Sequence, residues 1–290
     1  MHANRYAWGL ILPSLALALF IISYPFFTIV WQSLHEVSRY GQVRDFTGWA
    51  NFAAVLADPV FLASCWRTLW WTLAVVLGTL TCSLPLALVL QQEFYGRGLA
   101  RAIIMLPWAI SLAMSAIIWR WAFNDEFGLI NLGLQQLGLL SQAKSWLAQP
   151  ESAFLIEIAI GIWVSIPFTV SLLMGGLATL PAEIYEAARL EGASYLLCLR
   201  RLTLPLIKPF ISMAVVLNLI YVFNSFPIIW VMTQGGPDNQ THILVTYLYE
   251  LAFRLGRPGQ AAAVSLMMLL ILVVITAFYL RLQKREAAHA

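Results

Sequence analysis

Apolar residues dominate this chain in long runs, which are separated by shorter stretches rich in polar residues, glycine and proline. A run of about 20 apolar residues is long enough to cross the hydrocarbon core of a bilayer as a helix. Lipid offers no partner to open backbone groups, so such runs fold as helices. Six runs meet this criterion: Ala7–Trp31, Leu69–Leu90, Ala102–Ala122, Ala153–Leu177, Phe210–Met232 and Ala261–Leu280. We therefore predict an all-α integral membrane protein with six transmembrane helices, the first of them uncleaved.

Composition supports this prediction. The chain has 61% hydrophobic and 11% charged residues, and its mean hydropathy is +0.78. A soluble domain has about 25% charged residues, so these charges are too few to cover a water-facing surface. The net charge of +3 is small, and no basic run exceeds Arg200-Arg201. Nucleic-acid binding is therefore not expected. No repeat or low-complexity linker divides the chain, so residues 1–290 are predicted to form one membrane domain.

Lysine and arginine placement predicts the orientation. One group of segments consists of the two ends of the chain, the loop around Arg97 and the Pro181–Pro209 loop. This group contains more lysine and arginine residues than the other loops do. Loops rich in these residues stay in the cytoplasm. We therefore expect both termini and the Pro181–Pro209 loop to be cytoplasmic.

The Pro181–Pro209 loop has the pattern of a helical hairpin. Pro181 favours a helical first turn, and Glu183 and Glu186 suit the positive start of a helix. Gly192 can separate this helix from a second one, predicted from about Ser194 to Leu202 and ended by Pro205. Such a hairpin suits docking of a partner protein, although the same pattern also fits a hairpin resting on lipid headgroups.

The motifs of this loop resemble the "EAA" loop of carbohydrate-uptake permeases of the maltose/glycerol-phosphate type. The matching stretches are Tyr185–Ala188, Gly192-Ala193 and Thr203–Pro209, with Glu191 where the family usually has aspartate. Further resemblances cover nearly the whole chain: Phe46–Phe52, Leu106-Pro107, Trp163 and Thr233–Pro237 with Asn239 and Thr241.

The resemblance implies the permease subunit of an ABC type I importer in the bacterial inner membrane. It implies four kinds of protein in the complex: this chain, a second homologous permease, a dimer of ATPase subunits and an extracytoplasmic solute-binding protein. It also implies that the cytoplasmic coupling-helix loop contacts the ATPase through Glu186, Ala187, Ala188, Gly192, Leu204 and Pro205.

Catalytic chemistry is not expected on this chain. It has no phosphate-binding G-x-x-x-x-G-K-[ST] motif and no protease or hydrolase motif. The cysteines Cys65, Cys82 and Cys198 lack the spacing of a metal site. We therefore expect no enzyme activity, no metal and no cofactor here, with ATP and Mg bound by the partner ATPase.

Polar residues inside predicted spans are candidates for the substrate pathway, because they are costly at membrane depth. Asn218, Tyr221 and Ser225 have the spacing of one helix face, with Asn224 on its flank and Trp163 in the preceding span. Amides and aromatic rings suit a polyhydroxylated ligand, although polar residues also bond neighbouring helices.

Glu157 is the one acid well inside a predicted span. It is expected to reach the membrane surface or to pair with a cation such as Arg120, with a substrate or gating role as the alternative.

The function predicted from these observations is ATP-driven import of a sugar or sugar derivative. No basic residue lies well inside a span, which favours a neutral solute. The alternatives are an ion-coupled secondary carrier and a membrane assembly protein that transports nothing.

Overall fold

The computed structural model describes residues 2–289, with side chains from residue 11 to residue 281. The terminal residues Met1 and Ala290, expected in the cytoplasm, lie outside the described residues, as do the side chains of Arg5, Lys284 and Arg285. The chain forms two compact units: unit 1 comprises residues 1–62 and 247–274, and unit 2 comprises residues 63–246 and 275–290.

Unit 1 joins the first long helix to a small hairpin. Its elements are α1 (His2–Ser33), β1 (His35–Val37), β2 (Val43–Phe46), α2 (Ala50–Leu56), the start of α3 (Pro59–Gln91), the end of α13 (Leu244–Tyr249), the π-type turn η2 (Glu250–Arg254) and the first part of α14 (Pro258–His289). The antiparallel strands pair His35 with Phe46 and Val37 with Val43. Asn51 Nδ2 donates to the carbonyls of Ser33 and His35, both at 2.9 Å. This side chain therefore ties the end of α1 to α2.

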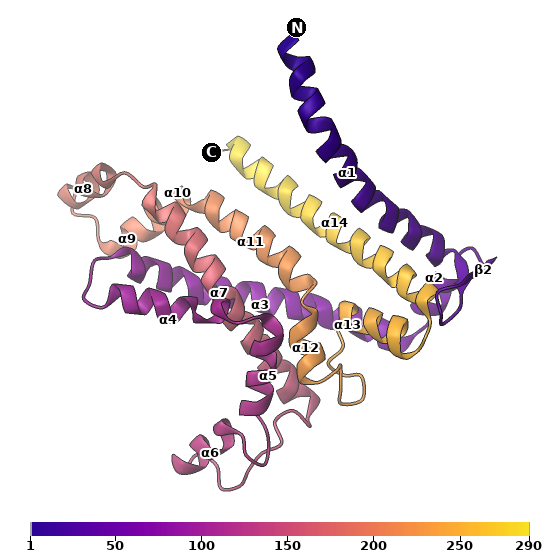
Figure 1. Cartoon of the computed structure of the whole chain (residues 1–290). Helices are drawn as coiled ribbons and strands as arrows, with labels where there is room; N and C mark the ends of the chain where they lie inside the picture. Colours follow the sequence, from indigo (N-terminus) through magenta and orange to yellow (C-terminus); the bar gives the residue numbers. More distant parts are fainter. Residues whose placement is uncertain (1, 290) are drawn as a thin grey trace. The chain divides into compact units, whose positions relative to one another are not determined.

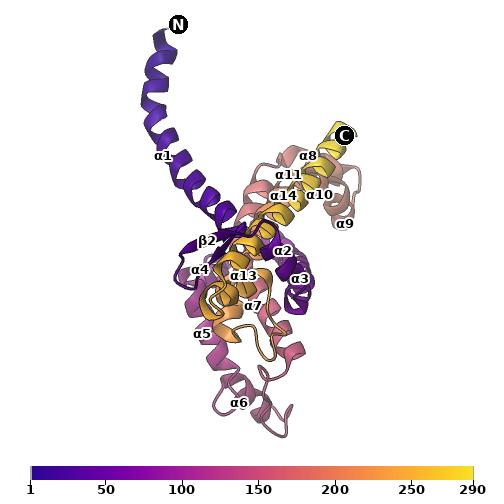
Figure 2. The same ribbon diagram turned by 90° about the vertical axis from the view of Figure 1, so that its right-hand side faces the viewer.

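Unit 2 holds the helices of the candidate site (Figure 1). After the rest of α3 come α4 (Arg97–Ala109), α5 (Leu112–Ala122), α6 (Leu129–Gln136), α7 (Pro150–Ala178), α8 (Ala182–Leu190), α9 (Tyr195–Cys198), the π-type turn η1 (Leu199–Thr203), α10 (Leu204–Leu206), α11 (Lys208–Phe223) and α12 (Phe226–Met232). Helix α7 contacts α4, α5, α11 and α12, so it is the centre of this unit. Figures 1 and 2 both show α6 at the end of unit 2 remote from α8.

Four helices in the described chain are long and apolar enough to cross a membrane: Ile11–Ser33, Pro59–Gln91, Pro150–Ala178 and Pro258–Arg281. Two bent helix pairs bring the number to six if each counts as one span. The all-helical membrane fold predicted from the sequence is confirmed, since the two short strands form only a hairpin.

The third predicted span differs from a single helix. Its residues fold into α4 and α5, which meet at an angle of 98°. Ile110 has an extended backbone, and the Ser111 hydroxyl accepts from the N–H of Met114 at 3.3 Å. Ser111 therefore begins a new helix as its N-cap instead of continuing the first one.

The fifth predicted span is also interrupted. Helix α11 ends at Phe223, and α12 begins at Phe226 with Pro227 in its first turn. A proline disfavours a helical conformation in the residue before it and lacks the N–H that a continuing helix needs. The helix therefore ends before Pro227 and restarts with the proline near its beginning, where a missing N–H costs little.

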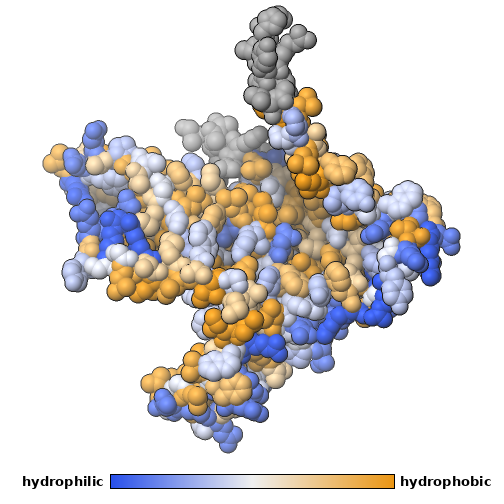
Figure 3. Space-filling model, viewed as in Figure 1, coloured by the Kyte–Doolittle hydropathy of each residue, from blue (hydrophilic) through white to orange (hydrophobic). Residues whose placement is uncertain are grey.

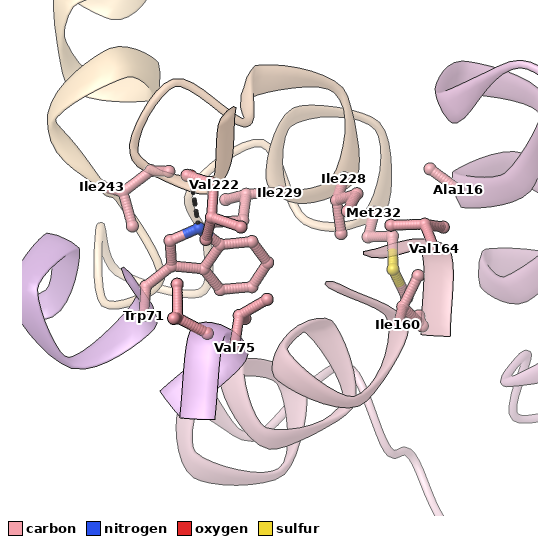
Figure 4. Close-up of a cluster of buried hydrophobic side chains, with 11 residues drawn as sticks. Trp71, Val75, Ala116, Ile160, Val164, Val222, Ile228, Ile229, Met232 and Ile243 are labelled. Carbon is pink, nitrogen blue, oxygen red and sulfur yellow. Dashed lines mark hydrogen bonds between the residues drawn. The ribbon is translucent and has the colours of Figure 1, made fainter. Parts of the chain in front are cut away.

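Trp71 lies at the centre of the apolar core of unit 2 (Figure 4). Its side chain is fully buried and lies beside Val75, Val222 and Ile229, within a cluster of apolar residues that α7 also contributes to. Its indole N–H donates to the Val222 carbonyl at 2.9 Å, near the end of α11. The same carbonyl accepts from the Ser225 N–H at 3.1 Å, so Trp71 fills the core and adds a second hydrogen bond beside the helix break.

Gly161 allows α7 to approach this tryptophan. A Cβ at Gly161 would lie 2.9 Å from atoms of Trp71 and Val75, whereas a Cβ at Gly175 on the same helix meets nothing within 4 Å. We expect Gly161→Ala to lower the free energy of unfolding by about 1–3 kcal/mol, since a packed core resists added volume. Gly175→Ala is expected to be neutral or to stabilise by up to about 1 kcal/mol through helix propensity. Thermal unfolding in detergent measures both, and equal effects would contradict this packing.

Candidate functional site

The segment between α7 and α11 folds as a helical hairpin, as predicted. Helix α8 follows Pro181, and Gly192 has a φ of +80°, a conformation that favours glycine. The N–H of Ala193 bonds the Ala188 carbonyl at 2.9 Å, which closes the end of α8. The Ser194 hydroxyl then accepts from the N–H of Leu197 and begins α9. The bend at Gly192 is therefore built entirely from local interactions.

The prediction that Pro205 ends the second helix is wrong. Helix α9 continues through η1 into α10, which holds Pro205 in its first turn and ends at Leu206. The π-type turn changes the hydrogen-bond pattern just before the proline, so that the proline occupies a first-turn position where its missing N–H is tolerated. The second arm of the hairpin is therefore longer than expected.

This hairpin leaves most of its surface uncovered by its own chain. Helix α8 contains no buried residue. Glu186, Ala187, Gly192 and Pro205 are exposed, while Ala188 and Leu204 are half-buried. Large apolar side chains are exposed as well, with Leu190 at 91% and Leu196 at 52%. Figure 3 shows hydrophilic residues gathered at this end of unit 2 among such apolar side chains. A mixed exposed surface of this kind suits contact with another protein.

The expected polar face of the fifth span is not continuous, and this prediction is corrected. Asn218 and Tyr221 lie on α11, but Asn224 and Ser225 lie in the break between α11 and α12. Asn218 and Ser225 are buried, whereas Tyr221 and Asn224 are exposed. The spacing rule for one helix face does not apply across a break.

A cavity of about 270 Å³ brings part of this set together. It lies between α4, α7 and α11, and its lining residues are Trp108, Val164, Ser165, Phe168, Leu217, Asn218 and Tyr221. None of these side chains carries a charge. The rings of Trp108 and Phe168 have centroids 6.1 Å apart. The cavity is therefore aromatic and neutral, with a few polar groups.

Asn218 is held in place within this cavity. Its Nδ2 donates to Thr169 Oγ1 and to the Ala214 carbonyl, both at 2.9 Å. Both N–H groups are thus used inside the protein, which leaves Oδ1 as the atom available to accept from an incoming hydroxyl. The amide bonds a neighbouring helix and also faces the cavity, so the two roles considered for it from the sequence are compatible.

Trp163 lies in a different cavity. It lines a space of about 360 Å³ with Trp119, Phe123, Leu155, Ile156, Ala159 and Ile160, and its ring meets that of Trp119 edge-on at 5.6 Å. The sequence analysis grouped Trp163 with Asn218 and Tyr221, but the structure places it in a different cavity from these two residues. Sequence reasoning also missed Trp108 and Phe168, whose aromatic character near Pro107 and Pro167 was the available signal.

The expectation that Glu157 reaches the membrane surface or pairs with Arg120 is wrong. Glu157 is completely buried, and its Oε1 accepts from the Thr233 hydroxyl at 2.8 Å. Arg120, the expected partner, donates instead to the Val231 carbonyl at 3.0 Å. Glu157 lies two turns inside α7, where α12 packs against that helix and brings Thr233 over the carboxyl group. The carboxyl group therefore does not reach the membrane surface.

No group of three or more His, Cys, Asp or Glu residues suited to a metal ion occurs in the part of the chain that the structure describes.

Residues 80–287 match the family described as binding-protein-dependent transport system inner membrane component. The chain belongs to this family. It is 54% identical to a probable ABC transporter permease protein of Brucella suis, over 99% of both chains. It is 33% identical to the trehalose/maltose transport system permease protein MalF of Thermococcus litoralis, over 94% of this chain and 91% of that relative.

A solved structure has the same fold. It is that of a bacterial ABC transporter involved in the import of alginate, with a TM-score of 0.84, 24% identity and coverage of 98% of this chain and 96% of the other. Family membership confirms the permease interpretation and replaces the carrier and assembly-protein alternatives. The chain is a multi-pass membrane component of an ABC importer, in which the ATPase is a separate subunit.

Tyr185 links the two arms of the hairpin, because its hydroxyl bonds Thr203 Oγ1 at 2.9 Å. We expect Tyr185→Phe to loosen the hairpin, since a hydrogen bond contributes about 1 kcal/mol. Trypsin should then cleave the purified chain at Arg189 and Arg200 about fivefold faster. Tyr195→Phe is the control, because Tyr195 is 65% exposed. Equal cleavage of the two variants would show that this bond does not hold the arms together.

Proposed function

We propose that this chain is the permease subunit through which an importer moves a sugar or sugar derivative from a solute-binding protein into the cytoplasm. The observation that carries the sugar assignment is the neutral cavity of Trp108, Phe168, Asn218 and Tyr221. Aromatic walls with a few placed polar groups are typical of sites for small uncharged ligands. Relatives named for trehalose/maltose, sulfoquinovosyl glycerol and diacetylchitobiose transport support a carbohydrate.

Within this cavity the rings would cover the apolar face of a sugar, while Asn218 Oδ1 and the Tyr221 hydroxyl would bond its hydroxyl groups. Asn224, Ser225 and Trp163 lie outside the lining of this cavity. They remain candidates for other positions along the pathway. No charged side chain lines the cavity, so a neutral solute is the better fit.

The hairpin is the part of the chain that we expect to contact the ATPase. Its exposed residues Glu186, Ala187, Gly192 and Pro205, together with the half-buried Ala188 and Leu204, form the proposed coupling surface. ATP and Mg would bind the partner ATPase dimer, and a second homologous permease would complete the pathway. The chain would lie in the bacterial inner membrane with both termini and the hairpin in the cytoplasm.

Motion would reach the spans through backbone continuity. Helix α8 is connected to α7 through Thr179–Pro181, and α10 is connected to α11 through Ile207. A displacement of the hairpin by the ATPase would therefore act on α7 and α11, two of the three helices that line the cavity.

Substitutions of Gly192 distinguish backbone strain from steric clash at the proposed coupling surface. A Cβ there meets nothing within 4 Å, but φ is +80°. We expect Gly192→Val to strain the bend and to reduce both co-purification of the ATPase subunits and solute transport by about tenfold. Gly192→Asn should retain at least half of both, because asparagine tolerates this conformation. Wild-type transport by the valine variant would remove the hairpin from the coupling path.

A substitution of Trp108 tests whether the cavity binds the sugar. Trp108 is 57% exposed, so its truncation leaves the core of unit 2 intact. We expect Trp108→Ala to raise the solute concentration for half-maximal uptake by about tenfold, which corresponds to roughly 1.4 kcal/mol of lost ring contact. Trp66→Ala is the matched control, since Trp66 is 61% exposed and does not line the cavity. Uptake in proteoliposomes containing the whole complex measures both. Equal losses would refute a specific site at Trp108.

A further inference from the structure

Glu157 is a completely buried carboxyl group that the proposed pathway does not use. Its Oε1 accepts from Thr233, and among the described residues its Oε2 has no hydrogen-bond partner. Burying such a group is costly unless it is well paired. An acid in a transmembrane helix is therefore a candidate for a specific role.

The group that Glu157 bonds is one end of the Thr233–His242 loop, which follows α12. Thr233 Oγ1 lies 2.7 Å from Thr241 Oγ1, so the two hydroxyls join the ends of the loop. The Thr241 hydroxyl also lies 2.8 Å from the Gly236 carbonyl, and the Thr241 N–H donates to the Gly235 carbonyl at 3.0 Å. Glu157 thus connects α7 to the Thr233–His242 loop, whose two ends are joined by Thr233 and Thr241.

The loop is fixed at two further points. Arg67 on α3 donates to the Asn239 carbonyl at 2.8 Å. Gly235, with a φ of +83°, lies against the buried His242, and a Cβ there would be 2.1 Å from the imidazole ring. The loop is therefore held by contacts from α3 and α7 as well as by its own residues.

Its tip is polar and exposed. Gln234, Asp238, Asn239 and Gln240 are exposed above the buried Thr241 and His242. The loop also borders a cavity of about 400 Å³ whose lining includes Arg120, Asp125 and Trp146. Helix α7 begins at this end and reaches α8 at its other end. In the orientation proposed above, the loop would lie on the outer face, from which a solute-binding protein would approach.

We propose that Glu157 is a positioning residue that holds the Thr233–His242 loop in the shape which the solute-binding protein contacts. This proposal rests on the proposed import function. A rigid loop loses little conformational freedom when a partner binds, so its shape contributes to affinity. The effect of Glu157 is exerted through Thr233 and not by contact with solute.

Two kinds of variant test this role. Glu157→Leu removes the hydrogen bond from the side of α7, and Thr233→Val removes it from the side of the loop, together with the Thr241 contact. Thr233→Val therefore covers the case in which Glu157→Leu does not fold. Glu157→Gln keeps an oxygen at this position and should restore wild-type behaviour. Glu151→Gln is the control, because Glu151 is an exposed acid in the first turn of the same helix.

The first measurement reports the shape of the loop. Ile243 directly follows the loop and is completely buried. Ile243→Cys is introduced after Cys65, Cys82 and Cys198 have been replaced by alanine, and spheroplasts are treated with a membrane-impermeant maleimide. We expect Glu157→Leu and Thr233→Val to increase the labelling rate about tenfold, and Glu157→Gln to change it less than twofold. An unchanged rate in the first two variants, or equal rates for Leu and Gln, would overturn the positioning role.

The second measurement reports docking. The assembled transporter in proteoliposomes is titrated with a purified, sugar-loaded binding protein that stimulates its ATPase. We expect Glu157→Leu to raise the half-saturating concentration at least fivefold while the maximal rate falls less than twofold. A loss confined to the maximal rate would overturn the docking role. If no sugar-loaded binding protein stimulates the wild-type complex, the proposed function fails, whereas the labelling result still decides whether Glu157 positions the loop.

Discussion

The hydrogen bond from the Trp71 indole to the Val222 carbonyl is the interaction on which the interrupted architecture of unit 2 depends. Helix α11 ends one residue later, at Phe223, and a helix end leaves carbonyl groups without intrahelical partners. In hydrocarbon each such group costs several kcal/mol if it stays unpaired. The Val222 carbonyl accepts from the Ser225 N–H at 3.1 Å, and Trp71 supplies a second donor from α3, while its ring packs beside Gly161 on α7. The break in α11 is therefore stabilised by the same residue that forms the core.

The walls of the cavity are uncharged. Asn218 is anchored by Thr169 and by its own helix, so it can present an oxygen without a counter-charge nearby. Trp108 lies at the end of α4, just before the chain turns into α5. Interrupted helices thus bring rings and an amide together at a depth where charged side chains would be costly.

The hairpin and the apolar runs could be predicted because their signals are local. Pro181, Gly192 and Ser194 each act on the few residues around them, and the structure places a helix start, a bend and a second start at these positions. The composition of the cavity could not be predicted in this way. Val164 lines the cavity of Asn218, while the adjacent Trp163 lines another one. Successive residues on a helix point about 100° apart, so only the packing of α7 against its neighbours decides which cavity each residue meets. The same holds for Glu157, whose partner Thr233 comes from a distant segment.

Helix α1 differs from the helices of unit 2, since none of its most apolar window is buried by the rest of the chain. Its apolar stretch of 23 residues, Ile11–Ser33, spans about 34 Å at 1.5 Å per residue. The hydrocarbon core of a bilayer is about 30 Å thick. The stretch is slightly longer than the hydrocarbon core is thick, so bilayer thickness bears on its tilt. Lipid composition is therefore a physical variable to which this segment responds, whereas α7 is held by its protein neighbours.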